Sequence, residues 1–323
     1  MSSELFPTAV KYPLLTLPSQ IFPLNEKIGG RRVWMWRDDP EDFGFGGNKV
    51  RFYEFLIPEI IAASPDVIIS SGSRYSNHVR VTALVAARLG IPALLLINED
   101  EPDDKKLPAG NLTIAAATGA EIRFIGHFAA LLKINECAEE LRSQGRKVFV
   151  VPSGGHTDGA VRAYANVFAE ALTRLSGYGV KIDRIFLPCA SGTTHAGLLC
   201  GAEIMSGKPG YDLPHISSFA VANTVRGAVK GITKLNSKAG ERFPDVLSGD
   251  PGSADVLDCG KNEYGTPDAE LLALRDRVII AEGVTLDKAY NINAFYGMKM
   301  VLESEDRASD AAVLYINTGG YVK

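Results

Sequence analysis

Lys49 is the residue of this sequence whose setting most clearly indicates chemistry. It lies in the segment from Phe45 to Arg51 (FGGNKVR), after two glycines and an asparagine and at the start of a helix-like pattern. Lysine forms Schiff bases with aldehyde cofactors. Because most lysines are solvated surface charges, Lys49 alone does not establish a site.

A second segment, from Cys189 to Gly197 (CASGTTHAG), follows an apolar strand-like run and precedes a helix-like one. Backbone N–H groups at such a turn bind phosphate. Ser191, Thr193 and Thr194 add hydroxyl donors, and Gly192 allows close approach to the backbone. The segment matches neither the nucleotide P-loop nor the G-x-G-x-x-G motif. An aldehyde-binding lysine and a phosphate-binding loop together indicate pyridoxal phosphate.

Ser76, Asn77 and His78 form a third polar group, directly before another helix-like segment. Ser76 or Asn77 can cap that helix. Free N–H groups and a hydroxyl at a helix start also suit an anion, such as the carboxylate of an amino-acid substrate. Taken alone, these residues favour capping.

Thr318 and two tyrosines complete the set of candidates. Thr318 lies between an apolar strand-like run and a Gly-Gly pair, where its hydroxyl either caps the strand end or hydrogen-bonds a pyridine nitrogen. A hydroxyl partner leaves that nitrogen largely unprotonated, which suits elimination more than transamination. Tyr264 and Tyr290 either pack half-buried against the core or serve as acid, base or nucleophile.

The composition argues against several classes of protein. The chain has 323 residues, enough for two cores, and its 46% hydrophobic and 22% charged residues are typical of globular proteins. A net charge of −4 without any Lys- and Arg-rich run argues against nucleic-acid binding. The four cysteines show no C-x-x-C spacing, so we expect buried free thiols and no metal site.

No segment approaches the ~20 apolar residues that a membrane-spanning helix needs. The first thirty residues contain Pro7, Pro13, Pro18 and Pro23 and no continuous apolar core, unlike a signal peptide. We therefore expect a cytoplasmic protein that is not bound to a membrane.

Short apolar runs alternate with helix-like segments along most of the chain, which indicates βαβ units and mostly parallel sheets. We therefore expect an α/β fold. The predicted strands are 32–37, 66–72, 93–98, 121–125, 147–152, 184–187, 216–221 and 312–316. The predicted helices are 50–63, 79–89, 112–118, 129–144, 161–175, 196–205, 268–276 and 291–302. Residues 237–261 are predicted to form a loop-rich segment that is mobile or binds a ligand.

Polar clusters follow four of the predicted strands, at residues 70–78, 153–157, 190–195 and 317–320. Ligands of open parallel sheets bind beyond the carboxyl ends of the strands. The candidate residues fall in or beside these clusters, so we expect them to meet at one site.

Several short motifs, taken in order across almost the whole chain, resemble a known family. The motifs are Arg37 to Asp39, Gly46 to Arg51, Ser76 to Arg80, Gly110 and Asn111, Thr194 to Gly197, Tyr264 and Gly265, Glu282 to Asp287, and Thr318 to Gly320. The ordered set resembles the D-cysteine desulfhydrase and 1-aminocyclopropane-1-carboxylate deaminase family of fold-type II (tryptophan synthase beta-like) pyridoxal-phosphate enzymes.

The resemblance implies two α/β domains, each with a mostly parallel sheet flanked by helices, and a cofactor in the cleft between them. The large domain would comprise residues 1–51 plus 161–323, and residues 52–160 would form a small domain inserted in it. By resemblance alone we also expect a homodimer.

The resemblance also implies a role for each candidate residue. Lys49 would be the Schiff-base lysine that shuttles the Cα proton, and Asn48 would lie near the cofactor hydroxyl. Residues 191–194 would surround the phosphate, and Thr318 would face the pyridine nitrogen. The remaining matches are Ser76, Asn77 and His78 at the substrate carboxylate, Ser76 also as a proton-transfer group, and Tyr264 and Tyr290 as active-site tyrosines.

The chain departs from the family pattern at three positions. Asn291 follows the second tyrosine, where the deaminase has glutamate and the desulfhydrase threonine; we expect Asn291 to contact substrate. Phe52 replaces the usual lysine after Arg51, and Thr193 replaces a common glycine. These departures affect the prediction of the substrate, not of the cofactor.

We expect a lyase that eliminates the β-substituent of a small amino acid, first of all D-cysteine, to give pyruvate, ammonia and sulfide. Deamination of the cyclopropane amino acid is the alternative. It ranks second because this chain has Thr318 where the deaminase has an apolar residue. A lyase for another β-substituted amino acid and a racemase are also open, as is a catalytically silent metabolite-binding protein.

Overall fold

The strands form two separate sheets. The computed structural model describes residues 5–6, 10–16, 18–39, 43–101, 110–126, 130–250, 252–261, 264–305 and 309–320. The larger sheet has the order β1-β2-β10-β7-β8-β9 and is parallel except for β1. Its strands are β1 (Gln20–Pro23), β2 (Val33–Arg37), β10 (Ala312–Asn317), β7 (Ile182–Cys189), β8 (His215–Ala220) and β9 (Asp255–Asp258).

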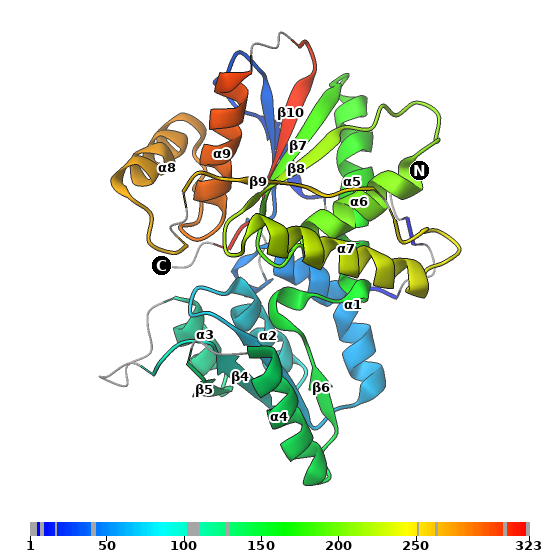
Figure 1. The fold of residues 1–323 in the computed structure, drawn as a ribbon, viewed down its shortest axis with the longest axis vertical. Helices are drawn as coiled ribbons and strands as arrows, with labels where there is room; N and C mark the ends of the chain where they lie inside the picture. The colour runs from blue at the N-terminus through cyan, green and yellow to red at the C-terminus, as the bar shows by residue number, and fades with distance from the viewer. Residues whose placement is uncertain are drawn as a thin grey trace.

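The smaller sheet is parallel throughout and comes from one continuous stretch of chain. Its order is β5-β4-β3-β6, formed by β5 (Glu121–Phe124), β4 (Ala93–Ile97), β3 (Val67–Gly72) and β6 (Val148–Val150). In Figure 1 this sheet and its helices lie below the larger sheet, with α1 and α7 near the boundary. The predicted α/β fold of mostly parallel sheets flanked by helices is confirmed.

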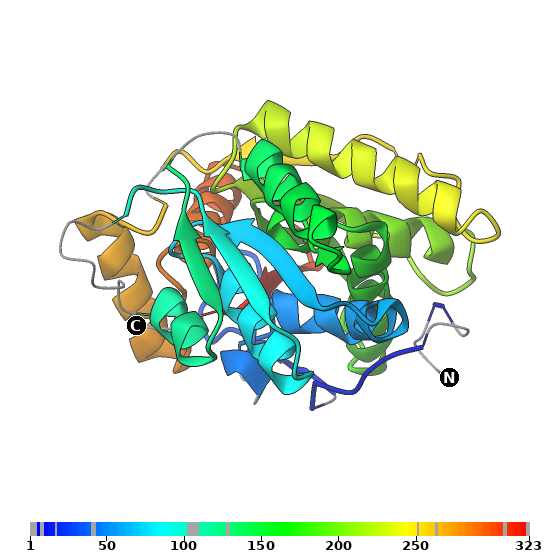
Figure 2. The ribbon, with the colours of Figure 1, turned by 90° about the horizontal axis from the view of Figure 1, so that it is seen from below.

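Helices cover both sheets (Figures 1 and 2). In the larger layer, helix α5 (Asp158–Gly177) packs directly on helix α6 (Thr193–Met205). A Cβ at Gly197 or Gly201 would come within 2.7 Å of the Cβ atoms of Tyr164 or Phe168, so only glycine permits this close approach. The helices are α1 (Asn48–Ala63), α2 (Asn77–Arg88), α3 (Asn111–Ala117), α4 (Ala130–Ser143), α5 (Asp158–Gly177), α6 (Thr193–Met205), α7 (Val225–Arg242), α8 (Ala269–Glu282) and α9 (Asn291–Ser304).

Each predicted strand and helix coincides with an observed one, but three further elements lie outside them. These are β1, α7 and β9; the end of α7 and strand β9 fall within 237–261, and the other described residues of that segment form turns and loops, as predicted. Helix α7 buries Ala228, Ile232 and Leu235 on one face, but its many charged and polar residues make the segment polar on average, so no apolar run marks it in the sequence. Strand β9 is short and forms through its pairing with β8.

The carboxyl ends of β3, β6, β7 and β10 lie toward the boundary between the two layers. The four polar clusters of the sequence follow these strands, as predicted. Among the described residues, no helix is both long and apolar enough to cross a membrane.

Candidate active site

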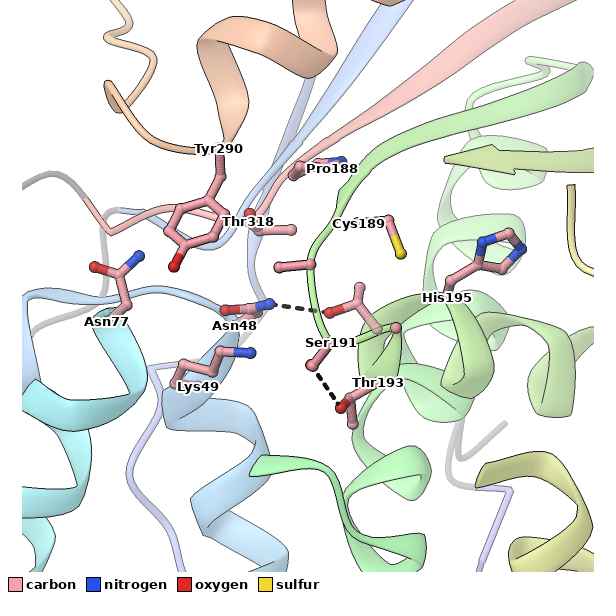
Figure 3. A pocket seen from close by; sticks show the side chains of 13 residues that line it. Asn48, Lys49, Asn77, Pro188, Cys189, Ser191, Thr193, His195, Tyr290 and Thr318 are labelled. Carbon is pink, nitrogen blue, oxygen red and sulfur yellow. Dashed lines mark hydrogen bonds between the residues drawn. The ribbon is translucent and has the colours of Figure 1, made fainter. Parts of the chain in front are cut away.

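The polar clusters line two cavities that share Lys49, Ala190, Ser191 and Tyr290. The inner cavity is narrow, and Figure 3 shows side chains from both layers converging on it. The outer cavity has a volume of about 520 Å³. Of the predicted site residues, the inner cavity is lined by Asn48, Lys49, Asn77, Ser191, Gly192, Thr193, Thr194, Tyr290 and Thr318, and Ser76, His78 and Tyr264 line the outer one.

Lys49 presents its amine between the two layers. Its Nζ atom donates a hydrogen bond to the carbonyl oxygen of Gly154 at 2.9 Å and lies 4.6 Å from the ring centroid of Phe52. Burial lowers the pKa of Lys49 to about 7, although the nearby Cys189 thiol acts in the opposite direction. A large share of this amine is therefore uncharged and nucleophilic at neutral pH.

Phe52, one of the departures from the family pattern, forms the apolar floor beneath that amine. Its side chain is fully buried and packs edge-on against Tyr164. An aromatic ring at this position removes water from one side of Lys49, which is the environment that lowers a lysine pKa. We therefore infer that Lys49 is reactive in this chain although Phe52 stands where the family usually has a lysine.

A buried carboxylate fixes the start of α1, which carries Lys49. Asp38 accepts hydrogen bonds from Trp36 Nε1 at 2.9 Å, from Arg51 Nε at 2.7 Å and from the Tyr164 hydroxyl. The carbonyl oxygen of Asp38 also accepts from the N–H of Gly47 at 2.6 Å. The ion pair with Arg51 is fully buried and hydrogen-bonded, so Lys49 emerges from a rigid turn.

The segment from Ser191 to Thr194 forms a cradle of donors at the start of α6. Ser191 Oγ and Thr193 Oγ1 lie 3.1 Å apart, and Asn48 Nδ2 donates to Thr194 Oγ1 at 2.9 Å (Figure 3). The first N–H groups of the helix have no acceptor within the helix. Gly192 precedes them with a φ of +87°, and a Cβ there would lie 2.6 Å from Cγ1 of Ile232.

Ser76, Asn77 and His78 start α2, but their side chains play different parts. Ser76 caps the helix, because its Oγ accepts from the N–H of Val79 at 3.3 Å, and it also lines the outer cavity. His78 is buried, with Nε2 2.8 Å from the Ser70 hydroxyl. Burial, assisted by the charge of Lys49, lowers the pKa of His78 to about 3, so the ring is neutral.

Tyr264 and Tyr290 come from separate segments and meet at their hydroxyl groups. The two oxygens are 2.6 Å apart, and Tyr264 also lies 2.9 Å from the hydroxyl of Ser73, which the sequence did not single out. Burial raises the pKa of Tyr264 and raises that of Tyr290 well above its usual value. Both hydroxyls therefore keep their protons at neutral pH and can donate them.

Asn291 lies behind Thr318 rather than on a cavity wall, which corrects the expectation that it contacts substrate. It is fully buried; its Oδ1 accepts from the N–H of Thr318 at 3.1 Å, and its Nδ2 is 3.3 Å from Thr318 Oγ1. The same Nδ2 donates to Asp287 Oδ1 at 2.6 Å. Because both amide atoms have fixed partners, the Thr318 hydroxyl accepts from Asn291 and its own proton is free to point elsewhere.

The comparison with known protein families agrees with this arrangement of an amine, an anion cradle and a hydroxyl. Residues 11–319 match the family model described as pyridoxal-phosphate dependent enzyme. The chain belongs to this family.

The relatives of this pyridoxal-phosphate-dependent enzyme cover nearly its whole length. A protein of Pyrococcus abyssi, named provisionally as a 1-aminocyclopropane-1-carboxylate deaminase, is 31% identical over 96% of this chain and 92% of its own. A D-cysteine desulfhydrase of Yersinia enterocolitica is 28% identical over 96% of this chain and 94% of its own. A crystal structure described as an ACC deaminase homologue has a TM-score of 0.81 and 28% identity, and the match covers 98% of this chain and 93% of that one.

The donor set of the enzyme fits pyridoxal phosphate. A partly uncharged lysine suits the aldehyde, and the cradle before α6, which a Cβ at Gly192 would distort, suits the phosphate. Thr318 offers a hydroxyl proton on the opposite side of the inner cavity from the cradle (Figure 3). When bound, the cofactor withdraws electrons from the substrate Cα.

The depressed pKa of Lys49 predicts a particular pH dependence of cofactor capture. The rate constant for binding pyridoxal phosphate to the cofactor-free enzyme should rise as the pH increases through about 7 and then level off, because only the uncharged amine attacks an aldehyde. Stopped-flow absorbance measures this rate. A rate that keeps rising above pH 9 would show an ordinary, solvated lysine.

Replacing Gly192 by alanine should weaken cofactor binding by about tenfold or more. The substitution places a methyl group 2.6 Å from Ile232 and strains a backbone with positive φ, so the cradle must shift. Equilibrium dialysis gives the dissociation constant. Gly207→Ala is the matched control, since Gly207 also has positive φ but has nothing within 4 Å of its added Cβ; equal losses in both variants would contradict the role of the cradle.

Proposed function

We propose that the enzyme catalyses β-elimination on a small thiol-bearing amino acid, D-cysteine first, giving pyruvate, ammonia and sulfide. The observation that carries the proposal is the Thr318 hydroxyl, which Asn291 holds with its proton free. If this hydroxyl lies at the ring nitrogen of bound pyridoxal phosphate, that nitrogen would stay unprotonated, which suits loss of a good leaving group more than opening of a cyclopropane ring. The names of the relatives support both reactions.

The proposal gives the residues of the chain distinct tasks. Lys49 binds the cofactor and removes the Cα proton, and Ser76 stands ready as the proton-transfer group for the opposite face. Asn48 and residues 191–194 hold the cofactor hydroxyl and phosphate. The start of α2, with Asn77, receives the substrate carboxylate. The neutral ring of His78 is hydrogen-bonded to Ser70 of strand β3 and so fixes the start of α2 on the smaller sheet.

The paired tyrosines supply a proton to the leaving group. Cleavage of the Cβ–S bond releases a thiolate, and the hydrogen-bonded hydroxyls of Tyr264 and Tyr290 retain their protons at neutral pH. The organic product after loss of the thiol is aminoacrylate, which water converts to pyruvate and ammonia. The outer cavity, which Tyr264 lines, leaves room for the departing group.

A panel of substrates tests the proposal. The holoenzyme is incubated with D-cysteine, L-cysteine, β-chloro-D-alanine, D-serine, D-alanine and 1-aminocyclopropane-1-carboxylate, and pyruvate, ammonia, sulfide and the L-enantiomer of alanine are measured. We expect equal amounts of all three products from D-cysteine. Ammonia from the cyclopropane amino acid alone would favour the deaminase, and inversion of D-alanine without pyruvate would favour a racemase.

The overall organisation of the enzyme is also part of this proposal. We propose a division into 1–51 plus 161–323 and 52–160, supported by the membership of the two sheets. A homodimer is proposed from the family resemblance, and the cytoplasm stays the expected location. Sedimentation of the holoenzyme tests the dimer, because a monomer at micromolar concentration would contradict it.

A further inference from the structure

Arg80 is a fully buried cation that no carboxylate contacts among the described residues. Its Nη1 atom donates to Asn77 Oδ1 at 2.9 Å and to Asn111 Oδ1 at 2.6 Å, and its Nη2 atom donates to the carbonyl oxygen of Gly46 at 3.0 Å. The Nε atom has no hydrogen-bond partner in the part of the chain that the structure describes. Because an unpaired buried charge is costly, its presence indicates that another charge completes the site.

Asp287 does not serve as that partner. It acts on Arg80 only through space, because its oxygens accept from the N–H groups of Ala289, Tyr290 and Asn291 and from the Asn291 amide. Burial lowers the pKa of Arg80 to about 10, so the guanidinium stays protonated at neutral pH. A positive charge therefore remains beside the inner cavity.

Arg80 is connected to the inner cavity by the side chain of Asn77, which it holds by a hydrogen bond. The Oδ1 atom of Asn77 accepts from Arg80 and, at 3.2 Å, from Asn111 Nδ2, so the amide can take only one orientation. Its Nδ2 atom then lies on the side that faces Tyr290 and the cavity (Figure 3). Asn77 is 5% exposed, and its Nδ2 makes no hydrogen bond to another described residue.

We propose that Arg80 is the positioning residue of the carboxylate end of the active site. It fixes Asn77 as a donor toward the cavity and supplies the charge that balances the substrate α-carboxylate. The inference rests on the proposed function in that it takes an amino acid as the substrate. This role explains why the charge of Arg80 lies buried at the start of α2.

Two ligands that differ in whether they carry a carboxylate test the role of the Arg80 charge in the unmodified enzyme. Alanine and alaninamide of each hand, which carry no leaving group, are titrated into the holoenzyme while the visible absorption of the cofactor is followed. We expect alanine of the preferred hand to bind on the order of tenfold to a hundredfold more tightly than its amide. Equal affinities would overturn the inference, whether or not the enzyme releases sulfide from any substrate.

Substitutions then separate charge from structure. Arg80→Lys keeps the charge and Arg80→Gln removes it, while Asn111→Ser breaks a hydrogen bond of the same network without changing charge. We expect Arg80→Gln to lose most of the preference for alanine over alaninamide, with a raised KM and a smaller change in kcat. Arg80→Lys and Asn111→Ser should retain most of the preference. Equal losses in all three variants, or none in Arg80→Gln, would reduce Arg80 to a structural residue.

Discussion

Lys49→Ala should lower kcat on the order of a thousandfold to ten-thousandfold and abolish the visible absorption of the bound cofactor. Among the described residues, no lysine other than Lys49 lines either cavity, so the variant loses the amine that we propose to hold the cofactor and to take the Cα proton. The fold should survive, because the removed amine makes one hydrogen bond, to Gly154, and the Asp38–Arg51 pair that fixes α1 remains.

Two controls sharpen this result. Lys49→Arg keeps a cation but cannot capture an aldehyde, so it should be as inactive as the alanine variant. Lys230→Ala removes an exposed lysine of α7 and should leave turnover unchanged. Small amines such as methylamine should restore part of the activity of Lys49→Ala by replacing the missing base. Turnover of Lys49→Ala at close to the wild-type rate without added amine would refute the assignment of Lys49.

Tyr264→Phe and Tyr290→Phe should each lower kcat for elimination by about a hundredfold, with little change in the absorption of the bound cofactor. Each change removes one member of a hydroxyl pair whose oxygens are 2.6 Å apart. Because the two hydroxyls act as one unit, the double variant should be hardly slower than the slower single one. Steady-state kinetics of the three variants measure this coupling.

A comparison of two leaving groups distinguishes proton donation by the tyrosines from positioning of the substrate. A chloride leaving group needs no proton, so β-chloro-D-alanine should be eliminated by the tyrosine variants at nearly the wild-type rate. Tyr178→Phe alters an exposed tyrosine that stacks on Trp34 and serves as the control for loss of a phenol group. Equal losses with both leaving groups would indicate that the tyrosines position the substrate and do not donate a proton.

Local sequence was sufficient to predict the elements and the ends of the strands. Alternating apolar runs mark the strands of both sheets, and glycines and hydroxyl residues mark the starts of α1, α2 and α6. Helix α7 and strand β9 escaped this reasoning, since the apolar face of α7 lies among many charged and polar residues and β9 is a short strand that forms by pairing with β8. A short strand such as β9 depends on its neighbours more than on its own residues.

The pyridoxal-phosphate family could be recognised from the sequence, and Lys49 and the phosphate-type loop could be predicted from it, because these depend on residue types and backbone turns that lie close together along the chain. Tertiary structure decided the protonation of Lys49 over Phe52, the place of Asn291 behind Thr318 and the buried charge of Arg80 beside Asn77. These properties depend on loss of water and on hydrogen-bond partners from distant segments, and only the folded chain brings those partners together.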